Sequence, residues 1–160
     1  ASEATVTQST TWSESYAVAE VKFFRHMAGQ APNTTFHLKC LQICNLLLMG
    51  TGFSTYTFKT AVMHLLTIIQ QSGQRKSDYV LLLMDVMYYL WRCLQEKRLH
   101  HFFFGNDSVP EEIVLPSGFQ ESEPVNLFKH LALDPDAHAR MMRDFLVIRD
   151  RLKRMLIYGY

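Results

Sequence analysis

The chain has few of the residues from which disulfide frameworks and zinc sites are built. Only three of its 160 residues are cysteine, an odd number. Cys40 and Cys44 lie four residues apart, with no close cysteine or histidine pair to complete a zinc set. This count disfavours a disulfide framework. Because free cysteines are usually buried, we expect three buried thiols.

A long uninterrupted hydrophobic run is also missing. The most apolar stretch, residues 79–94, contains Asp85 and Arg92. A bilayer span needs roughly 20 apolar residues, so this stretch instead predicts a core helix buried on most of its sides. No signal-peptide pattern opens the chain. We expect a soluble chain with a flexible N-terminus over residues 1–12 and a single helical domain over residues 13–160.

An excess of charge of either sign is absent as well. Sixteen basic and fifteen acidic residues leave a formal net charge of +1, which disfavours recruitment of nucleic acid by a global field. Basic residues gather near the C-terminus, where Asp144 and Asp150 interrupt them. This pattern favours a solvated helix face, with a partner-binding face as the leading alternative. The basic residues are Arg140, Arg143, Arg149, Arg151, Lys153 and Arg154.

Apolar residues recur at helical spacing through most of the chain, and no stretch alternates with period two. The pattern predicts an all-α fold, a bundle of about five helices. Gly29 is expected to end the first helix as a C-cap, and Asp134 followed by Pro135 to begin the last. We expect helices over residues 13–28, 35–49, 54–71, 76–97, 126–131 and 135–156.

Residues 99–124 depart from this pattern. They hold three of the five prolines, together with Phe102, Phe103 and Phe104. The stretch is too long for a simple turn. We expect an irregular segment that its aromatic residues pack against the helices, with one helical turn near residues 110–113.

Catalytic motifs are not evident in the sequence. It has no glycine-rich phosphate loop, no nucleophile elbow and no HExxH. Glu111 and Glu112 are adjacent, so their side chains point apart, which favours solvated loop charges over metal ligands. His100 and His101 lack a third ligand nearby, and packing or hydrogen bonding is favoured for them. We predict no catalytic residue, no metal and no cofactor.

Two tripeptides match the pattern for N-linked glycosylation. They begin at Asn33 and Asn106. Such tripeptides arise by chance, and Asn33 would also serve as a helix cap, so the two residues are possible glycosylation sites only if this part of the protein faces the secretory lumen or the outside.

Four segments, in order, carry a family resemblance. They are Trp12-Ser13-Glu14-Ser15-Tyr16 with Glu20, Leu38-Lys39-Cys40-Leu41, Ser54-Thr55-Tyr56-Thr57-Phe58-Lys59-Thr60, and Cys93-Leu94-Gln95-Glu96-Lys97-Arg98-Leu99 with His101-Phe102-Phe103. Together they resemble the C-terminal helical lobe of the Mab, or cyclic GMP-AMP synthase-like, nucleotidyltransferase fold. Within that group, Phe102-Phe103-Phe104-Gly105-Asn106 and Asn126-Leu127-Phe128 look most like the inositol trisphosphate receptor-interacting proteins and their "like" members.

The resemblance implies a possible nucleotide site. In the active relatives this lobe lends side chains to the nucleotide, which would make Ser54, Thr55, Tyr56 and Lys59 nucleotide-binding residues here. For Lys59 the alternative is a lysine that packs its apolar stem against the protein surface. Two departures argue against synthesis, because Gln42 and Asn45 stand where the active relatives carry basic residues. The zinc-binding insert of the DNA-sensing relative is also missing, and the catalytic carboxylates would lie in a lobe that this chain does not contain.

Three hypotheses for function follow. The first is a non-enzymatic interaction module that binds a protein partner, a segment of a membrane receptor or channel, and no nucleic acid. The resemblance implies a membrane-anchored parent at the plasma or endoplasmic reticulum membrane, on a side that the sequence leaves open. The second is a nucleotide-binding or vestigial nucleotidyltransferase lobe. The third is a scaffold for the missing half of the fold.

Overall fold

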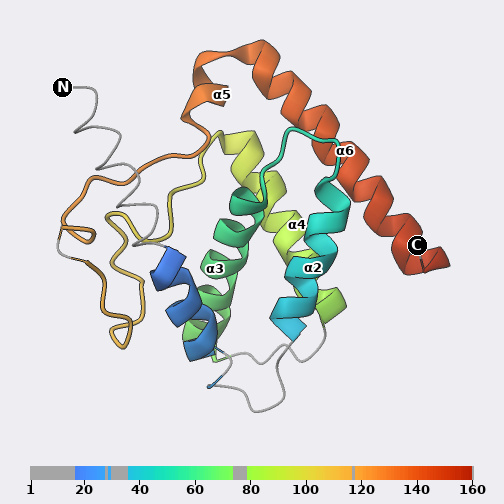
Figure 1. The fold of residues 1–160 in the computed structure, drawn as a ribbon. Coiled ribbons are helices and arrows are strands. Elements are labelled where there is room, and N and C mark those ends of the chain that lie inside the picture. Colours follow the sequence, from blue (N-terminus) through green and yellow to red (C-terminus); the bar gives the residue numbers. More distant parts are fainter. Residues whose placement is uncertain (1–16, 28, 30–35, 74–78, 117, 160) are drawn as a thin grey trace.

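Helices make up nearly all of the regular structure in the chain. A computed structural model describes residues 17–27, 29, 36–73, 79–116 and 118–159. Within these ranges the one β-bridge, between His100 and Asn126, is isolated, which confirms the all-α fold class. The helices cover residues 17–27, α2 (Phe36–Leu48), α3 (Thr55–Ser72), α4 (Tyr79–Glu96), α5 (Lys129–Leu133) and α6 (Pro135–Tyr158) (Figure 1).

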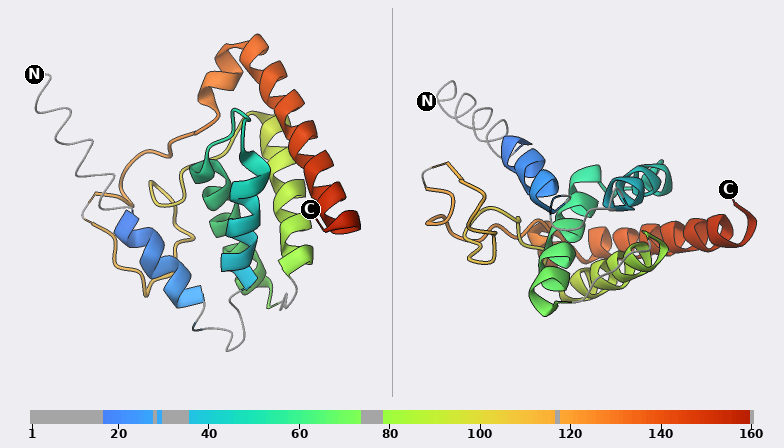
Figure 2. Two further views of the ribbon diagram at one scale, coloured as in Figure 1. Left: turned by 45° about the vertical axis from the view of Figure 1, so that its right-hand side comes forward. Right: turned by 90° about the horizontal axis from the view of Figure 1, so that it is seen from below.

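Helices α2, α3 and α4 form the centre of the bundle, and each packs against the other two. Helix α6 crosses α2 and α4 on one side, where the rings of Trp91 and Phe145 lie 5.0 Å apart. The helix over residues 17–27 lies on the other side, beside the long irregular segment (Figure 1 and Figure 2). There the rings of Phe23 and Phe102 meet edge to face at 4.8 Å.

The two ends of α3 follow from local chemistry. The Ser54 hydroxyl is the N-cap and accepts a hydrogen bond from the Thr57 amide at 3.1 Å. At the other end Gly73 adopts the left-handed conformation, with φ of 71°, and donates its amide to the Gln70 carbonyl. Both boundaries confirm the prediction from the sequence.

Helix α4 ends in a left-handed residue that is not glycine. Lys97 has a φ of 57°. Its amide donates to the Leu94 carbonyl at 3.2 Å, and the Arg98 amide donates to the Cys93 carbonyl at 2.9 Å. This pair of bonds is a Schellman motif, which turns the chain sharply out of α4 and into the irregular segment.

The irregular segment is held at its two ends by Asn126. The Asn126 side-chain oxygen accepts the amides of Leu99 and Phe128, and its amide donates to the Lys97 carbonyl, all at about 3 Å. The segment is packed down by buried aromatic side chains, as the sequence predicted. These are Phe102, Phe103, Phe104 and Phe119. Between residues 110 and 113 the structure has a single hydrogen-bonded turn.

Helix α6 begins at Asp134, whose carboxylate accepts the amides of Asp136 and Ala137, and Pro135 occupies the first helical position. Further along, two charged side chains hold the turn between α2 and α3. The Arg151 guanidinium donates to the carbonyls of Leu47 and Met49 at the end of α2. The Asp144 carboxylate accepts the Gly52 amide at 2.8 Å.

Two predictions about the helices need correction. Gly29 is itself helical and lacks the positive φ of a left-handed C-cap, so it does not have the predicted capping conformation. The short helix α5 begins at Lys129, three residues later than expected, because Asn126 is engaged in the side-chain bonds described above. Helix α4 is central and buried on most of its sides, as predicted, and Leu81, Met84 and Tyr88 lie on its one exposed face.

The three cysteines are free and buried, as predicted. Cys40 and Cys44 face each other one turn apart on α2, and the hydrogen bond between them, together with burial, raises the pKa of the Cys44 thiol. In the part of the chain that the structure describes, no helix has the length and apolar character needed to cross a membrane.

Candidate functional site

The residues expected to bind a nucleotide lie on the first turn and a half of α3. Ser54 is occupied as the N-cap, and its oxygen also lies 2.9 Å from the Thr57 hydroxyl. Thr55 is exposed at the first helical position. The structure therefore brings the predicted residues together, but it gives the Ser54 hydroxyl a structural role.

Tyr56 points towards the irregular segment. Its hydroxyl lies 2.5 Å from Nε2 of His101, and the two rings are 5.4 Å apart. The other ring nitrogen of His101 accepts the Phe103 amide at 3.2 Å. A neutral histidine that accepts at Nδ1 carries its proton on Nε2, so His101 donates to the Tyr56 oxygen. The predicted packing and hydrogen-bonding role of His101 is confirmed, and the Tyr56 hydroxyl anchors the segment to α3.

Lys59 forms an ion pair with the helix over residues 17–27. Its ammonium group lies 3.6 Å from a carboxylate oxygen of Glu20, which is the better buried partner. Burial raises the pKa of Glu20, and Lys59 opposes that shift. The pair thus connects two helices, and a phosphate would have to compete with Glu20 for Lys59. The nucleotide site stays a prediction.

The other residues singled out from the sequence lie apart from this site. Gln42 and Asn45 are exposed on α2.

Asn106 uses its side-chain amide to donate to the Phe102 carbonyl at 2.7 Å, and its side-chain oxygen accepts the Ser108 amide. Asn33 lies outside the described residues. Glycosylation of either asparagine stays a prediction. No group of three metal-ligating side chains occurs within the described ranges.

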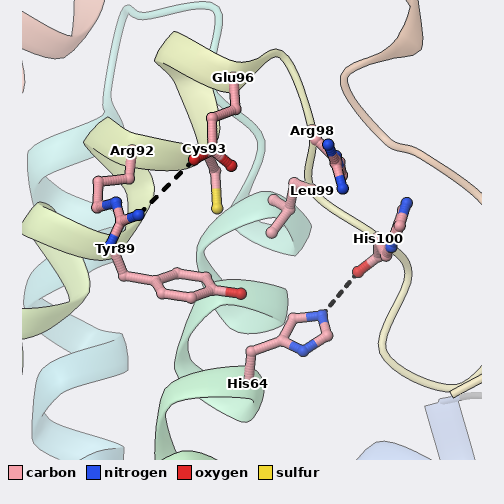
Figure 3. A pocket seen from close by; sticks show the side chains of 8 residues that line it. All are labelled: His64, Tyr89, Arg92, Cys93, Glu96, Arg98, Leu99 and His100. Atoms are coloured by element: carbon pink, nitrogen blue, oxygen red, sulfur yellow. Dashed lines mark hydrogen bonds and ion pairs between the residues drawn. The ribbon is translucent and has the colours of Figure 1, made fainter.

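A pocket of about 280 Å³ opens between α3, α4 and the segment that follows α4 (Figure 3). Helix α4 forms one wall, His64 of α3 forms the floor, and the chain from Arg98 to His100 forms the opposite wall. The His64 ring is hydrogen bonded through Nε2 to the His100 carbonyl at 2.7 Å, which joins floor and wall. The remaining lining residues are Tyr89, Arg92, Cys93, Glu96 and Leu99.

The electrostatics of this pocket favour neutral groups at the bottom and charges at the rim. Burial lowers the pKa of His64, which keeps its imidazole neutral at pH 7. Burial raises the pKa of the Tyr89 hydroxyl, and the nearby Cys93 adds to this shift. Burial also raises the pKa of the Cys93 thiol to about 11. A thiol with such a pKa is a poor nucleophile. The charged side chains Arg92, Glu96 and Arg98 are exposed at the opening.

The sequence did not single out this pocket. Its residues come from α3, from α4 and from the segment that follows α4, and only the tertiary contact between α3 and that segment brings His64 to the others. The sole advance signal was that Tyr89, Arg92 and Glu96 interrupt the apolar pattern of α4 on one side of the helix.

Comparison with known proteins provides the family context. The chain is 41% identical over 143 residues to a mouse protein named inositol 1,4,5-trisphosphate receptor-interacting protein-like 1. It is 36% identical over 151 residues to human inositol 1,4,5-trisphosphate receptor-interacting protein, and 33% identical over 143 residues to the zebrafish protein of that name. These relatives are named for interaction with the inositol 1,4,5-trisphosphate receptor.

These alignments cover 84%, 90% and 85% of the chain, but the chain spans only about a quarter of the length of these relatives, 26%, 28% and 26% respectively. No protein-family model matches the chain, and no solved structure is significantly similar to it. The resemblance to receptor-interacting proteins is therefore supported, whereas the relationship to the nucleotidyltransferase fold stays a prediction.

Proposed function

We propose that this chain is a non-enzymatic interaction module that binds an inositol 1,4,5-trisphosphate receptor or a related membrane receptor. The observation that carries the proposal is similarity, over more than four fifths of the chain, to proteins named for interaction with that receptor. The matched region is nearly the whole chain, so the module would correspond to one segment, about a quarter, of such a protein.

The contacts of α3 support binding over catalysis. In a nucleotide site, Tyr56 would present its ring to a base and Lys59 would be available to a phosphate. Here the Tyr56 hydroxyl bonds to His101, and Lys59 pairs with Glu20. Each of these contacts joins α3 to another part of the chain, which is a structural use of the same side chains.

Binding between the purified 160-residue chain and the purified cytosolic region of the receptor tests the proposal. We expect saturable binding that is lost when the chain is heat-denatured. A folded chain that shows no binding at micromolar concentrations of receptor would contradict the proposal.

The nucleotide-binding alternative is tested by thermal unfolding with added nucleotide. Because the polar groups of Ser54, Tyr56 and Lys59 are engaged, we expect millimolar ATP or GTP to leave the melting temperature unchanged. A rise in melting temperature that disappears in Tyr56→Ala would instead support the alternative. Tyr56→Phe is the matched control, because it removes the bond to His101 and keeps the ring.

We further propose that the longer protein is membrane-anchored at the plasma or endoplasmic reticulum membrane. This part of the proposal rests on the resemblance to the receptor-interacting proteins. It is tested by fractionation of the full-length protein expressed in cells. Use of Asn106 as a glycosylation site, scored by a shift in mass after glycosidase treatment, would place this part of the protein in the secretory lumen or outside.

A further inference from the structure

The outer face of α4 carries an exposed apolar stripe. Leu81, Met84 and Tyr88 are 50%, 52% and 66% exposed, and their spacing of three and four residues places them on one face of the helix, with the half-buried Asp85 at its edge. A row of exposed aliphatic and aromatic side chains on one helix face is suited to binding another apolar element.

The stripe leads directly into the pocket. Arg92 lies one turn beyond Tyr88 on the same face of α4 and lines the opening of the pocket, with Arg98 across from it (Figure 3). Arg92 is paired with Glu96 at 3.8 Å, but both side chains are more than half exposed. Such an exposed pair is weak, so another carboxylate can compete with Glu96 for Arg92.

Arg98 makes the opening of the pocket positive. Its guanidinium forms no ion pair or hydrogen bond with the described residues, and Glu96 is the one acidic residue that lines the pocket. Two guanidinium groups therefore face one carboxylate, and the histidine at the floor is neutral at pH 7. An additional negative charge would complement this end of the surface.

We propose that the stripe and the pocket together bind an amphipathic helix of the receptor. Apolar side chains of that helix pack on Leu81, Met84 and Tyr88, and an acidic side chain at one end enters the pocket between Arg92 and Arg98. The twelve residues from Leu81 to Arg92 span about 17 Å of helix, so a partner segment of roughly twelve residues suffices. This inference rests on the proposed function, since it names the surface by which the module binds.

Fluorescent peptides that tile the cytosolic region of the inositol 1,4,5-trisphosphate receptor provide the probe. Their anisotropy is measured against the 160-residue chain at low ionic strength. We expect one or a few peptides to bind, each with apolar residues at helical spacing and an acidic residue at one end. Arg98→Glu is expected to weaken binding by about tenfold or more, and Tyr88→Ala by a similar factor.

Two matched controls separate the surface from general effects of charge and apolar area. Arg143→Glu makes the same charge change on the exposed face of α6, and Leu46→Ala removes an exposed apolar side chain from α2. Both are expected to bind the peptide as the wild type does. Glu96→Gln removes the competing carboxylate and is expected to tighten binding several-fold.

The outcomes distinguish this inference from the proposed function. If the wild type binds a peptide and Arg98→Glu binds it no more weakly than Arg143→Glu does, the proposed surface is not the binding site, while the receptor-binding function stands. If binding is lost equally in Tyr88→Ala and Leu46→Ala, the stripe is likewise excluded. If the folded wild type binds neither a peptide nor the intact receptor, both proposals fail. Unchanged melting temperatures of the variants establish that each is folded.

Discussion

His101 is a buried histidine, 4% exposed, with a partner at each ring nitrogen. Burial lowers its pKa to about 4, with the nearby His64 adding to the shift. The neutral ring is what the site accommodates, because Nδ1 must accept from the Phe103 amide. A protonated ring would have a donor there instead, facing another donor. The tyrosine, the histidine and the amide therefore form a short chain of bonds that holds the irregular segment on α3.

This arrangement predicts a pH dependence of stability. An unfolded histidine takes up a proton below its usual pKa of 6.5, whereas folded His101 does so only near pH 4. The free energy of unfolding is therefore at its full value above pH 6.5 and falls as the pH is lowered towards 4, by roughly 3 kcal/mol from this group. His101→Gln, which does not titrate, is expected to lose this part of the dependence. Urea unfolding of both proteins from pH 7 to 4 measures the difference. If the free energy of unfolding falls equally with pH in both proteins, His101 is not the source of this dependence.

Gly105 is required by both its backbone conformation and its neighbours. It has a φ of 63°, and a Cβ placed there would clash with the Ser122 carbonyl oxygen. Gly105→Ala is expected to lower the free energy of unfolding by more than about 2 kcal/mol. Gly50→Ala is the control, because Gly50 also has a positive φ but nothing lies near its Cβ position. It should show only the conformational cost of about 1–2 kcal/mol. Equal losses in the two variants would mean that the segment shifts to admit the methyl group.

Between elements, the charged side chains of α6 do more than solvate the helix. Arg151 satisfies two carbonyl groups at the end of α2, and Asp144 accepts the amide of Gly52 in the following turn. The end of a helix leaves carbonyl groups without intrahelical partners, and a cation there also interacts favourably with the helix dipole. Two of the charged residues on α6 thus position the start of α3, and with it the residues Ser54 to Lys59.

Loss of the Arg151 guanidinium is expected to loosen this turn. Arg151→Met keeps most of the apolar stem and removes both hydrogen bonds, which should cost about 1.5–3 kcal/mol of stability. Hydrogen exchange should speed up at the amides of residues 50–53. Arg149→Met, on an exposed position of the same helix, should change stability by less than about 0.5 kcal/mol. If the two variants differ in free energy of unfolding by less than about 0.5 kcal/mol, Arg151 does not hold the turn between α2 and α3.

At the scale of the whole molecule, aromatic contacts hold the outer parts to the helical centre. The ring of Phe23 is fully buried and packs on Phe102, which in turn meets Phe103 and His64. The helix over residues 17–27, the irregular segment and α3 therefore share one hydrophobic core. The pocket and the outer face of α4 lie at the border of this core, where the irregular segment leaves α4.

Removal of the Phe23 ring is expected to destabilise the whole fold. Phe23→Ala leaves a cavity between three elements and should lower the free energy of unfolding by about 3–5 kcal/mol. Val21→Ala, on the exposed side of the same helix, should change it by less than about 0.5 kcal/mol. Chemical denaturation followed by circular dichroism measures both. If Phe23→Ala unfolds with wild-type stability, the first helix is not part of the cooperative core.

The sequence alone determined the elements of this protein. Helical spacing of apolar residues predicted the helices, and Asp134 with Pro135 marked the start of the last one, because capping depends on bonds between near neighbours. It also predicted the buried thiols and the irregular aromatic segment. Lys97 was not foreseen as a left-handed residue that ends α4, since glycine is the usual sign of that conformation.

The tertiary structure alone decided which surfaces are free. Periodicity shows that a side of α4 is apolar, but it cannot show that Leu81, Met84 and Tyr88 lack cover, because cover comes from helices distant in sequence. In the same way, Tyr56 was expected to face a nucleotide, and the structure places its hydroxyl on His101, forty-five residues away. Local bonds set the helices, whereas burial and pairing of individual side chains depend on contacts that no short stretch of sequence contains.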